Sequence, residues 1–275
     1  FTDDNFQRER RTTLKNPIVR SWWDHTYAKM GDREKWEIIP YFAAKFGQFI
    51  TNTMMRNIVG QTKSAFDIGD VMNQQKLLLV SLSKGTIGDL NSNLLGLILV
   101  SKIQIAAMRR QNIAKEDRKD FFLYIDEFQN YVTDSIESIL SEARKYGLWL
   151  IVAHQFLHQM SITLSHALFG NVGTLVSFRI SAEDARVMMS HFDPYVGAYD
   201  LANLGIREAY AKMLVKWQVR DPLSIKTRSV PDIRIDPQYI ESLYQISRSK
   251  YTRSLKEARK DIVEKKSEIE KIDNF

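Results

Sequence analysis

The chain contains no cysteine among its 275 residues. This absence excludes disulfides, thiolate zinc sites and cysteine nucleophiles, and it fits a reducing compartment such as the cytoplasm. Long hydrophobic runs are also missing. The longest, residues 94–100, falls far short of the ~18 residues that span a bilayer. We therefore expect no segment of this chain to cross a membrane by itself.

The composition is that of an ordinary globular protein, with 44% hydrophobic and 26% charged residues. Its length suits one large domain or a domain with a subdomain. The net charge of +6 is compatible with a polyanionic partner without requiring one. Because the sequence opens at Phe1 inside a polar, helix-like stretch, we interpret it as a fragment of a longer protein.

The first part of the chain, residues 1–68, contains no convincing strand and is predicted to be an all-helical subdomain. Breaks are expected at Asn16-Pro17 and Gly31-Asp32. Its aromatic stripe favours a helical core over a partner surface. The stripe begins with Trp22, Trp23, Tyr27 and Met30 at helical spacing. At the other end, residues 237–275 are predicted to form one long helix with a charged, solvated final stretch.

The middle part, residues 69–236, alternates strand and helix patterns, which predicts a parallel sheet covered on both faces. The candidate strands are residues 76–82, 121–126, 148–153, 174–180 and 208–215. The candidate helices are a mostly apolar one at about residues 91–110, one with a capping-box-like start at Asp134 and Glu137 and an end at Gly147, and one capped by Ser181 with Asp184.

Two adjacent carboxylates, Asp126 and Glu127, directly follow the apolar strand pattern at residues 121–125. Ligands of parallel α/β sheets bind at the carboxyl ends of the strands. An aspartate there suits Mg²⁺ bound to nucleotide phosphates, and a neighbouring glutamate suits the base that orients an attacking water. The alternative is a strand that ends in solvated acids.

The segments that follow favour the first interpretation. A helix ending in Ala143-Arg144 and Gly147 leads to a strand that delivers Gln155, and residues 169–174 (FGNVGT) and 177–179 (SFR) come next. In this order and spacing, residues 50 to 230 resemble the HerA/FtsK superfamily of hexameric DNA-pumping ATPases. The resemblance is strongest to the TraG/TraD-type coupling ATPases of type IV secretion and conjugation.

The resemblance implies an α/β fold with a RecA-like P-loop NTPase sheet, and an ATP-driven DNA translocase that uses ATP and Mg²⁺. It implies sequence-independent DNA binding, assembly of the full-length protein into a homo-oligomeric, hexameric ring, and relaxosome or secretion-channel proteins as partners. It also implies a cytoplasmic position at the inner face of the membrane. The helical subdomain is then the expected docking surface for the substrate complex.

Residue by residue, Asp126 matches the Walker B aspartate that holds Mg²⁺, through water, and Glu127 the catalytic glutamate. Gln155 matches the polar residue that contacts the γ-phosphate or the attacking water. Phosphoryl transfer needs positioning and charge neutralisation more than covalent chemistry, so these residue types suit it. The alternative for Gln155 is an ordinary polar residue at a strand end.

Arg179 and Arg186 match positions at which related motors place arginines that reach a neighbouring subunit's nucleotide, and Arg144 is a further candidate. An arginine supplied by a neighbour would complete the charge balance around the phosphates. The alternative for Arg179 is a solvent-facing strand residue, free or paired with Glu183.

The sequence departs from the family pattern in one respect, because no G-x-x-x-x-G-K-[ST] phosphate-binding loop occurs in it. Residues 60–64 (GQTKS) lack the required glycine spacing and follow a helix. We therefore expect the chain to be the C-terminal half of the motor and inactive in isolation. The alternatives are a soluble HerA-like repair translocase and a scaffold of the same fold that no longer hydrolyses ATP.

Basic residues gather in two places and suggest contacts with DNA phosphates, although a solvated face is the alternative for each. The first cluster is Arg109, Arg110, Lys115, Arg118 and Lys119, and the second lies within residues 248–260. His154 and His158 have the i,i+4 spacing of a metal pair, but no third ligand is evident, so a metal role is not favoured.

Overall fold

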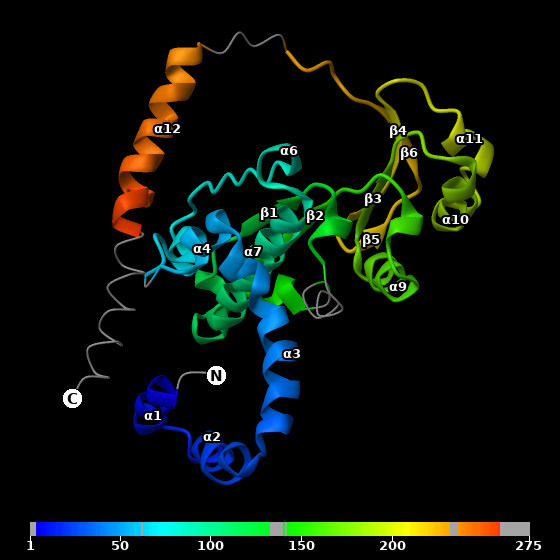
Figure 1. Cartoon of the computed structure of the whole chain (residues 1–275). Coiled ribbons are helices and arrows are strands. Elements are labelled where there is room, and N and C mark those ends of the chain that lie inside the picture. The colour runs from blue at the N-terminus through cyan, green and yellow to red at the C-terminus, as the bar shows by residue number, and fades with distance from the viewer. Residues whose placement is uncertain (1–3, 62, 133–139, 141, 232–235, 259–275) are drawn as a thin grey trace. The chain divides into compact units, whose positions relative to one another are not determined.

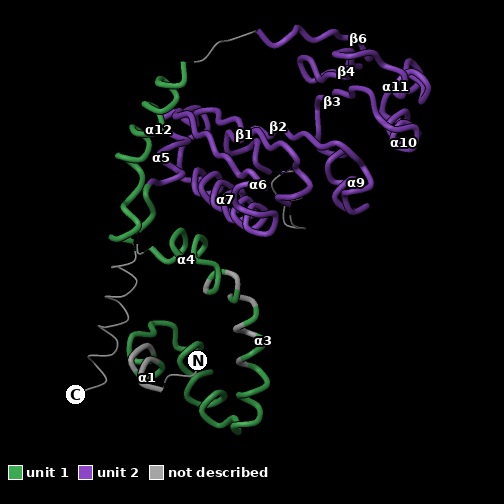
Figure 2. The backbone as a smooth tube through the Cα atoms, turned by 45° about the horizontal axis from the view of Figure 1, so that its top comes forward, with its two compact units in different colours: residues 1–65, 236–275 green, residues 66–235 purple. Residues whose placement is uncertain are grey.

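The structure, a computed structural model, describes residues 4–61, 63–132, 140, 142–231 and 236–258. The elements are labelled in Figure 1. The chain divides into two compact units (Figure 2). The first combines Phe1–Ala65 with Asp236–Phe275, and the second is Phe66–Ile235.

The first unit is helical throughout its described residues, as the spacing of its apolar residues predicts. Its elements are α1 (Asp4–Thr13), α2 (Pro17–Ser21), the short turns η1 (Trp22–Thr26) and η2 (Tyr27–Lys29), α3 (Asp32–Thr51), α4 (Thr53–Val59) and α12 (Pro237–Tyr251). The side-chain oxygen of Asn16 accepts a hydrogen bond from the backbone N–H of Ile18 at 2.9 Å and so starts α2. The rings of Trp22 and Trp23 pack around Tyr27, which is buried, but Trp22 is 40% and Trp36 69% exposed, so the predicted helical core is only partly formed among the described residues.

The prediction of one long C-terminal helix needs correction. Helix α12 ends at Tyr251, because Thr252 adopts an extended backbone with φ −125° and ψ 162°. The charged stretch at residues 259–275 lies outside the described residues.

The second unit combines helices with two small sheets. Strand β1 (Phe121–Ile125) pairs in parallel with β2 (Leu148–Val152). The other strands, β3 (Thr174–Ser177), β4 (Glu208–Val215), β5 (Gln218–Val219) and β6 (Leu223–Lys226), pair in antiparallel fashion around β4. The α/β class is thus confirmed. The expectation of a wholly parallel sheet is wrong for β4, which is antiparallel to β3, β5 and β6, and whose two-residue connection to β5 is a hairpin.

Helices and turns connect these strands. They are α5 (Ile68–Asn73), α6 (Lys84–Ile87), α7 (Asp89–Arg109), η3 (Arg110–Asn112), η4 (Lys115–Asp117), η5 (Phe128–Asn130), η6 (Ala143–Tyr146), η7 (Leu157–Gln159), α9 (Ile162–Asn171), α10 (Ala182–Phe192) and α11 (Ala198–Ala202). The hydroxyl of Ser181 accepts from the N–H of Asp184, which confirms the predicted cap of α10. Gly147 ends η6 at φ 70°, as a C-cap glycine does. The predicted start at Asp134 and Glu137 lies outside the described residues.

Two strand predictions were wrong. Residues 76–82 form no strand, and Leu77 and Leu79 are 84% and 82% exposed. A strand needs a neighbour to satisfy its backbone hydrogen bonds, and this segment finds none in the part of the chain that the structure describes. Strand β3 ends at Ser177, so Arg179 lies in a bend beyond it and not on a strand.

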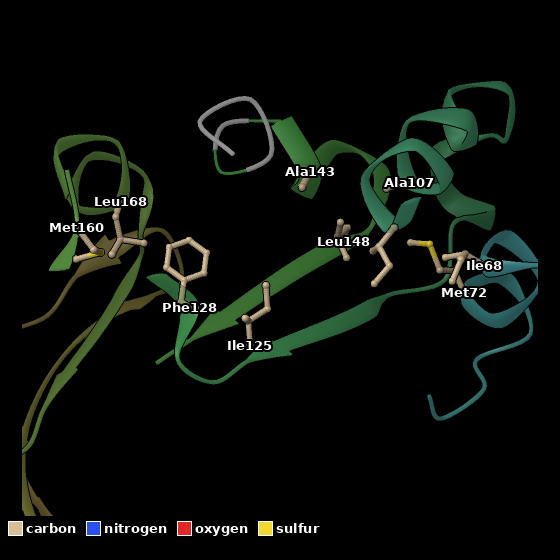
Figure 3. Close-up of a cluster of buried hydrophobic side chains, with 10 residues drawn as sticks. Ile68, Met72, Ala107, Ile125, Phe128, Ala143, Leu148, Met160 and Leu168 are labelled. Atoms are coloured by element: carbon tan, nitrogen blue, oxygen red, sulfur yellow. The ribbon is translucent and has the colours of Figure 1, made fainter. Parts of the chain in front are cut away.

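One face of the β1–β2 pair is buried and the other is open. Alternate side chains of both strands join a core with helix α7 that includes Ile103, Ala107 and Leu148 (Figure 3). The opposite face carries Phe122 and Trp149, whose stacked rings lie 6.5 Å apart and which are 54% and 37% exposed. The pair is therefore covered on a single face by the described residues, whereas parallel sheets are normally covered on both.

Helix α7 and the turn η3 bear on the expectation that no segment crosses a membrane. Asp89–Asn112 is long and apolar enough to cross a membrane by length and composition, although its longest uninterrupted apolar run is short. Core helices pass the same test, and Ile103 and Ala107 of α7 belong to the core of this unit. Its opposite side is not buried, since Ile105 is 51% exposed. The predicted burial between two layers therefore holds for one side alone among the described residues.

Candidate functional site

The ends of β1 and β2 are joined by backbone hydrogen bonds that place the two carboxylates. The N–H of Ala153 donates to the carbonyl of Ile125, and the N–H of Phe128 donates to the carbonyl of Ala153, each at 2.9 Å. The side chain of Phe128 is fully buried and lies between Ile125 and Leu168 (Figure 3). This anchor holds the intervening Asp126-Glu127 pair at the carboxyl end of the sheet, as the sequence predicts.

Glu127 adopts the left-handed backbone conformation, with φ 50° and ψ 45°. This conformation costs a residue with a side chain roughly 1–3 kcal/mol and is concentrated at functional sites. Its N–H donates to Oδ1 of Asp126 at 2.9 Å, and the buried Phe128 follows it directly. The surrounding contacts therefore hold Glu127 in a conformation that its own chemistry disfavours.

Both carboxylate oxygens of Glu127 accept hydrogen bonds from side-chain amides. Nε2 of Gln155, which follows β2, donates to Oε1 at 2.5 Å. Nε2 of Gln129 donates to Oε2 at 2.7 Å, while the Oε1 of Gln129 is buried and has no hydrogen-bond partner. Neutral donors fix the direction of a carboxylate without neutralising its charge. The structure thus brings Glu127 and Gln155, two residues predicted from the sequence for the nucleotide site, into direct contact.

His154 adds a second polar group beside this contact. Burial lowers the pKa of His154, while the charges of Asp184 and Glu127 oppose the shift. The imidazole is therefore neutral at pH 7. Asp184 is itself buried and accepts from the N–H of Leu157 at 3.4 Å, which ties the loop after β2 to helix α10.

The side chain of Asp126 is exposed, and its Oδ1 accepts a hydrogen bond from the backbone N–H of Glu127. The described residues contain no group of three or more acidic, histidine or cysteine side chains that could enclose a metal ion, and the pair of His154 and His158 gains no third ligand. A single carboxylate suits Mg²⁺, which takes its other ligands from phosphates and water. The residues present thus fit the carboxylate side of a Mg²⁺–nucleotide site.

The three candidate arginines occupy different positions. Arg179 and Arg186 are both exposed, the former in the bend after β3 and the latter on α10. The structure records no ion pair between Arg179 and Glu183 among the described residues. Arg144 lies in η6, before β2 begins, and its guanidinium stacks on the ring of Trp217 at 4.9 Å. Five strand residues, about 16 Å, separate η6 from the end of β2 where Gln155 follows.

The first basic cluster divides into buried and exposed members, and this corrects the prediction for Arg110. Arg110 is 2% exposed. Its Nη1 donates to the carbonyl oxygens of Lys119 and Tyr146 at 2.9 and 3.0 Å, and its Nε donates to Asn73. A guanidinium committed to these partners cannot reach a DNA phosphate. Arg109, Lys115 and Lys119 are exposed and remain candidates for contacts with DNA phosphates.

Arg118 is half-buried and is also engaged with the backbone. Its Nε donates to the carbonyl of Ile113 at 2.9 Å and its Nη1 to the carbonyl of Lys145 at 2.5 Å. The guanidinium lies 5.6 Å from the centre of the Tyr146 ring. Arg118 thus connects the segment before β1 to the turn before β2, which limits its contribution to DNA contacts.

Replacing Arg110 with Ala should lower the free energy of unfolding by roughly 3 kcal/mol, because buried carbonyl oxygens would lose charged donors. The neighbouring Arg109→Ala should change it by less than about 0.5 kcal/mol, since Arg109 is an exposed residue at the end of α7. Urea unfolding followed by circular dichroism measures both. Equal stability of the two variants would show that the Arg110 contacts contribute nothing.

The sequence analysis did not identify Gln129 or Trp217. Gln129 is only two residues beyond Glu127, but side chains two residues apart in an extended chain lie on one face roughly 7 Å apart, too far for a hydrogen bond between them to be expected. The left-handed turn at Glu127 folds Gln129 back onto the carboxylate. Trp217 carried a local signal, because Lys216-Trp217 separates two strand patterns, yet its contact with Arg144 joins residues far apart in the sequence.

Comparison with known proteins gave a family match over most of the chain. Residues 41–221 match the profile described as the type IV secretion-system coupling protein DNA-binding domain. The resemblance predicted from the sequence is thereby confirmed. A search of curated protein sequences returned no match.

Solved structures that match part of this chain show low sequence identity. The bacterial conjugative coupling protein TrwBdeltaN70 is 18% identical with a TM-score of 0.38, and the match covers 47% of this chain and 37% of that one. Plasmid coupling protein TrwB in complex with the GTP analogue GDPNP is 17% identical, with a TM-score of 0.41 and coverage of 50% and 38%. The chain thus spans less than two-fifths of the length of these TrwB structures.

A viral protein also matches. The genome packaging NTPase B204 from Sulfolobus turreted icosahedral virus 2, in complex with ATP-gammaS, is 14% identical with a TM-score of 0.41. The match covers 61% of this chain and 74% of the viral one.

Proposed function

The chain belongs to the family of type IV secretion-system coupling protein DNA-binding domains, and from this premise we propose that it forms the hydrolytic half of an ATP-driven DNA translocase in secretion or conjugation. The observation that carries the proposal is the geometry of Glu127. Its carboxylate is aimed by Gln155 and Gln129 at the carboxyl end of the β1–β2 pair, beside the exposed carboxylate of Asp126. The family membership favours a coupling protein over a HerA-like repair motor.

In this proposal each side chain has a distinct role. Glu127 accepts the proton of the attacking water, and Gln155 holds both the glutamate and that water in position. Asp126 would hold Mg²⁺, which neutralises phosphate charge when the nucleotide is bound. The neutral His154 beside them adds no positive charge that would weaken the base.

We further propose that the phosphate-binding loop comes from sequence outside these 275 residues, in a RecA-like arrangement. The open face of the β1–β2 pair supports this, because Phe122, Tyr124 and Trp149 are left exposed on a parallel sheet. The segment at residues 76–82, which has a strand pattern but forms no strand, and whose Leu77 and Leu79 are exposed, also suits pairing with a strand from outside these residues. A hexameric ring at the inner face of the membrane, served by relaxosome or channel proteins, completes the proposal.

DNA binding tests the proposal independently of hydrolysis. We expect the chain to bind DNA with little sequence preference and with an affinity that falls steeply as salt rises, because lysine and arginine contacts release counterions. Fluorescence anisotropy with two unrelated oligonucleotides across a salt series measures this. Affinity that is insensitive to salt, or that depends strongly on sequence, would contradict a translocase.

The exposed part of the first basic cluster allows a matched comparison. Changing Lys115 and Lys119 to Glu reverses two exposed charges without touching the carbonyl contacts of Arg110. Arg110→Lys serves as a control, because it keeps the charge and alters the buried contacts. An unchanged affinity in the double variant would remove this cluster from the DNA-binding surface.

A further inference from the structure

The hairpin between β4 and β5 has an unusual turn. Pairing of Val215 with Gln218 leaves Lys216 and Trp217 as a two-residue loop. Both have left-handed backbone conformations, with φ 50° and φ 65°. Turns of this kind favour Asn-Gly, because those residues adopt positive φ at low cost. A lysine and a tryptophan at the tip are therefore disfavoured by the backbone, and such exceptions are concentrated at functional positions.

The side chain of Trp217 is presented to solvent with a cation beside it. It is 74% exposed, and the Arg144 guanidinium lies 4.9 Å from the ring centre. An exposed indole contributes nothing to a core, so its packing does not explain its place at the tip. A tryptophan face together with an arginine is a platform on which an unpaired nucleic-acid base can stack.

The surroundings of this platform are rich in positive charge. Lys145 follows Arg144 in the chain. The guanidinium of Arg118, which precedes Lys119, donates a hydrogen bond to the carbonyl oxygen of Lys145. Exposed Lys119 and Lys216 form no ion pair within the part of the chain that the structure describes. Glu142 offsets part of this charge through its 3.6 Å pair with Lys145. Lys216 in the turn and Arg144 beside the indole are exposed cations, which suit phosphates that flank a stacked base.

We propose that the Lys216-Trp217 turn and Arg144 form a binding site for single-stranded nucleic acid. A base stacks on Trp217, and Lys216 and Arg144 contact the adjacent phosphates. The assignment of DNA as the ligand of this site rests on the proposed function. The site is separate from the Glu127 site, because Arg144 precedes β2 and Gln155 follows it. Strand binding and hydrolysis can therefore be perturbed independently.

Two single substitutions test the site without weakening the turn. Lys216→Asn and Trp217→Gly introduce the residues that this turn prefers, so the thermal midpoint should stay equal or rise. With a fluorescent dT oligonucleotide, Trp217→Gly should weaken binding about tenfold or more and leave the salt slope unchanged. Lys216→Asn should lower the salt slope by about 0.7, the value for one phosphate contact on a single strand.

Tyr199→Ala provides a matched control, because Tyr199 is an equally exposed aromatic residue, at 79%, on α11. It should bind the oligonucleotide as the unaltered chain does. A duplex of the same length forms the second arm, and Trp217→Gly should affect it far less, since paired bases cannot stack on the indole.

The outcomes separate this inference from the proposed function. If the unaltered chain binds no oligonucleotide, both fail. If it binds with a steep salt dependence and the two variants bind equally well, the turn is not the site and the proposed function stands. If the variants keep their affinity but lose self-association in sedimentation experiments, the turn is an interface between copies, and the inference is overturned. If Trp217→Gly weakens binding to the single strand and to the duplex equally, the assignment to single-stranded nucleic acid is overturned.

Discussion

Replacing Glu127 with Gln should reduce ATP turnover by about a hundredfold or more in an assembly that includes the phosphate-binding loop. The amide cannot accept a proton from water at neutral pH, which removes the base from the reaction. The shape of the side chain is kept. Steady-state hydrolysis with Mg²⁺ measures the loss, and binding of a fluorescent nucleotide should remain largely intact.

The hydrogen bonds around Glu127 can adapt to this substitution, so it should change the chemistry of the side chain without moving it. A glutamine at position 127 would turn one N–H₂ group toward the Nε2 of Gln129 or Gln155. Rotating the Gln129 amide by half a turn relieves the conflict, because its Oε1 has no partner at present and can accept that hydrogen bond. The positions of the three side chains are therefore retained while the chemistry is lost.

A matched control is Glu183→Gln, which makes the same change on the exposed surface of α10. Its turnover should equal that of the unaltered protein. Asp126→Ala should weaken Mg²⁺–nucleotide binding as well as turnover, since Asp126 is assigned to the metal and not to the water. Turnover near normal in Glu127→Gln would refute the catalytic assignment, and vigorous hydrolysis by the 275-residue chain alone would show that its phosphate loop lies within it.

Mixing Arg179→Ala with Glu127→Gln should restore part of the activity that each variant lacks. An arginine supplied by a neighbouring subunit can be worth ~10³ in turnover, so each variant should be nearly inactive alone. In mixed rings some interfaces pair an intact glutamate with an intact arginine. Titrating one variant into the other, with hydrolysis as the readout, measures the recovery.

Arg179 is accessible for this role, and Arg144 supplies a control. Arg179 is exposed in the bend after β3, without an ion pair among the described residues that would occupy it. Arg144 lies in η6, before β2, and its guanidinium stacks on the ring of Trp217. The Arg144→Ala variant should therefore keep the ATP turnover of the unaltered protein. Absence of recovery under conditions of proven subunit exchange would place Arg179 within its own subunit. The same titration with Arg186→Ala then tests the remaining candidate.

Local sequence patterns determined the features that depend on nearby residues. Patterns within a few residues predict the strand before Asp126, the strand before Gln155 and the cap of α10 at Ser181, through continuous apolar runs for the strands and a side-chain hydrogen bond for the cap. The family resemblance followed from the order of these elements, and the profile match confirms it. The cap of α10 is local because a helix satisfies most of its own backbone, and the two strands can be recognised by apolar runs of strand length.

Tertiary contacts alone decided the rest. The segment at residues 76–82 has a strand pattern but no strand, because pairing needs a neighbour that its own sequence cannot specify. Arg110 has the composition of a phosphate contact but is buried, because the carbonyls it binds come from segments up to 37 residues away. The hydrogen bonds from Gln129 and Gln155 to Glu127 likewise depend on tertiary structure. They require the left-handed backbone of Glu127 and the meeting of two strand ends at one edge of the sheet, and hydrophobic periodicity predicts neither.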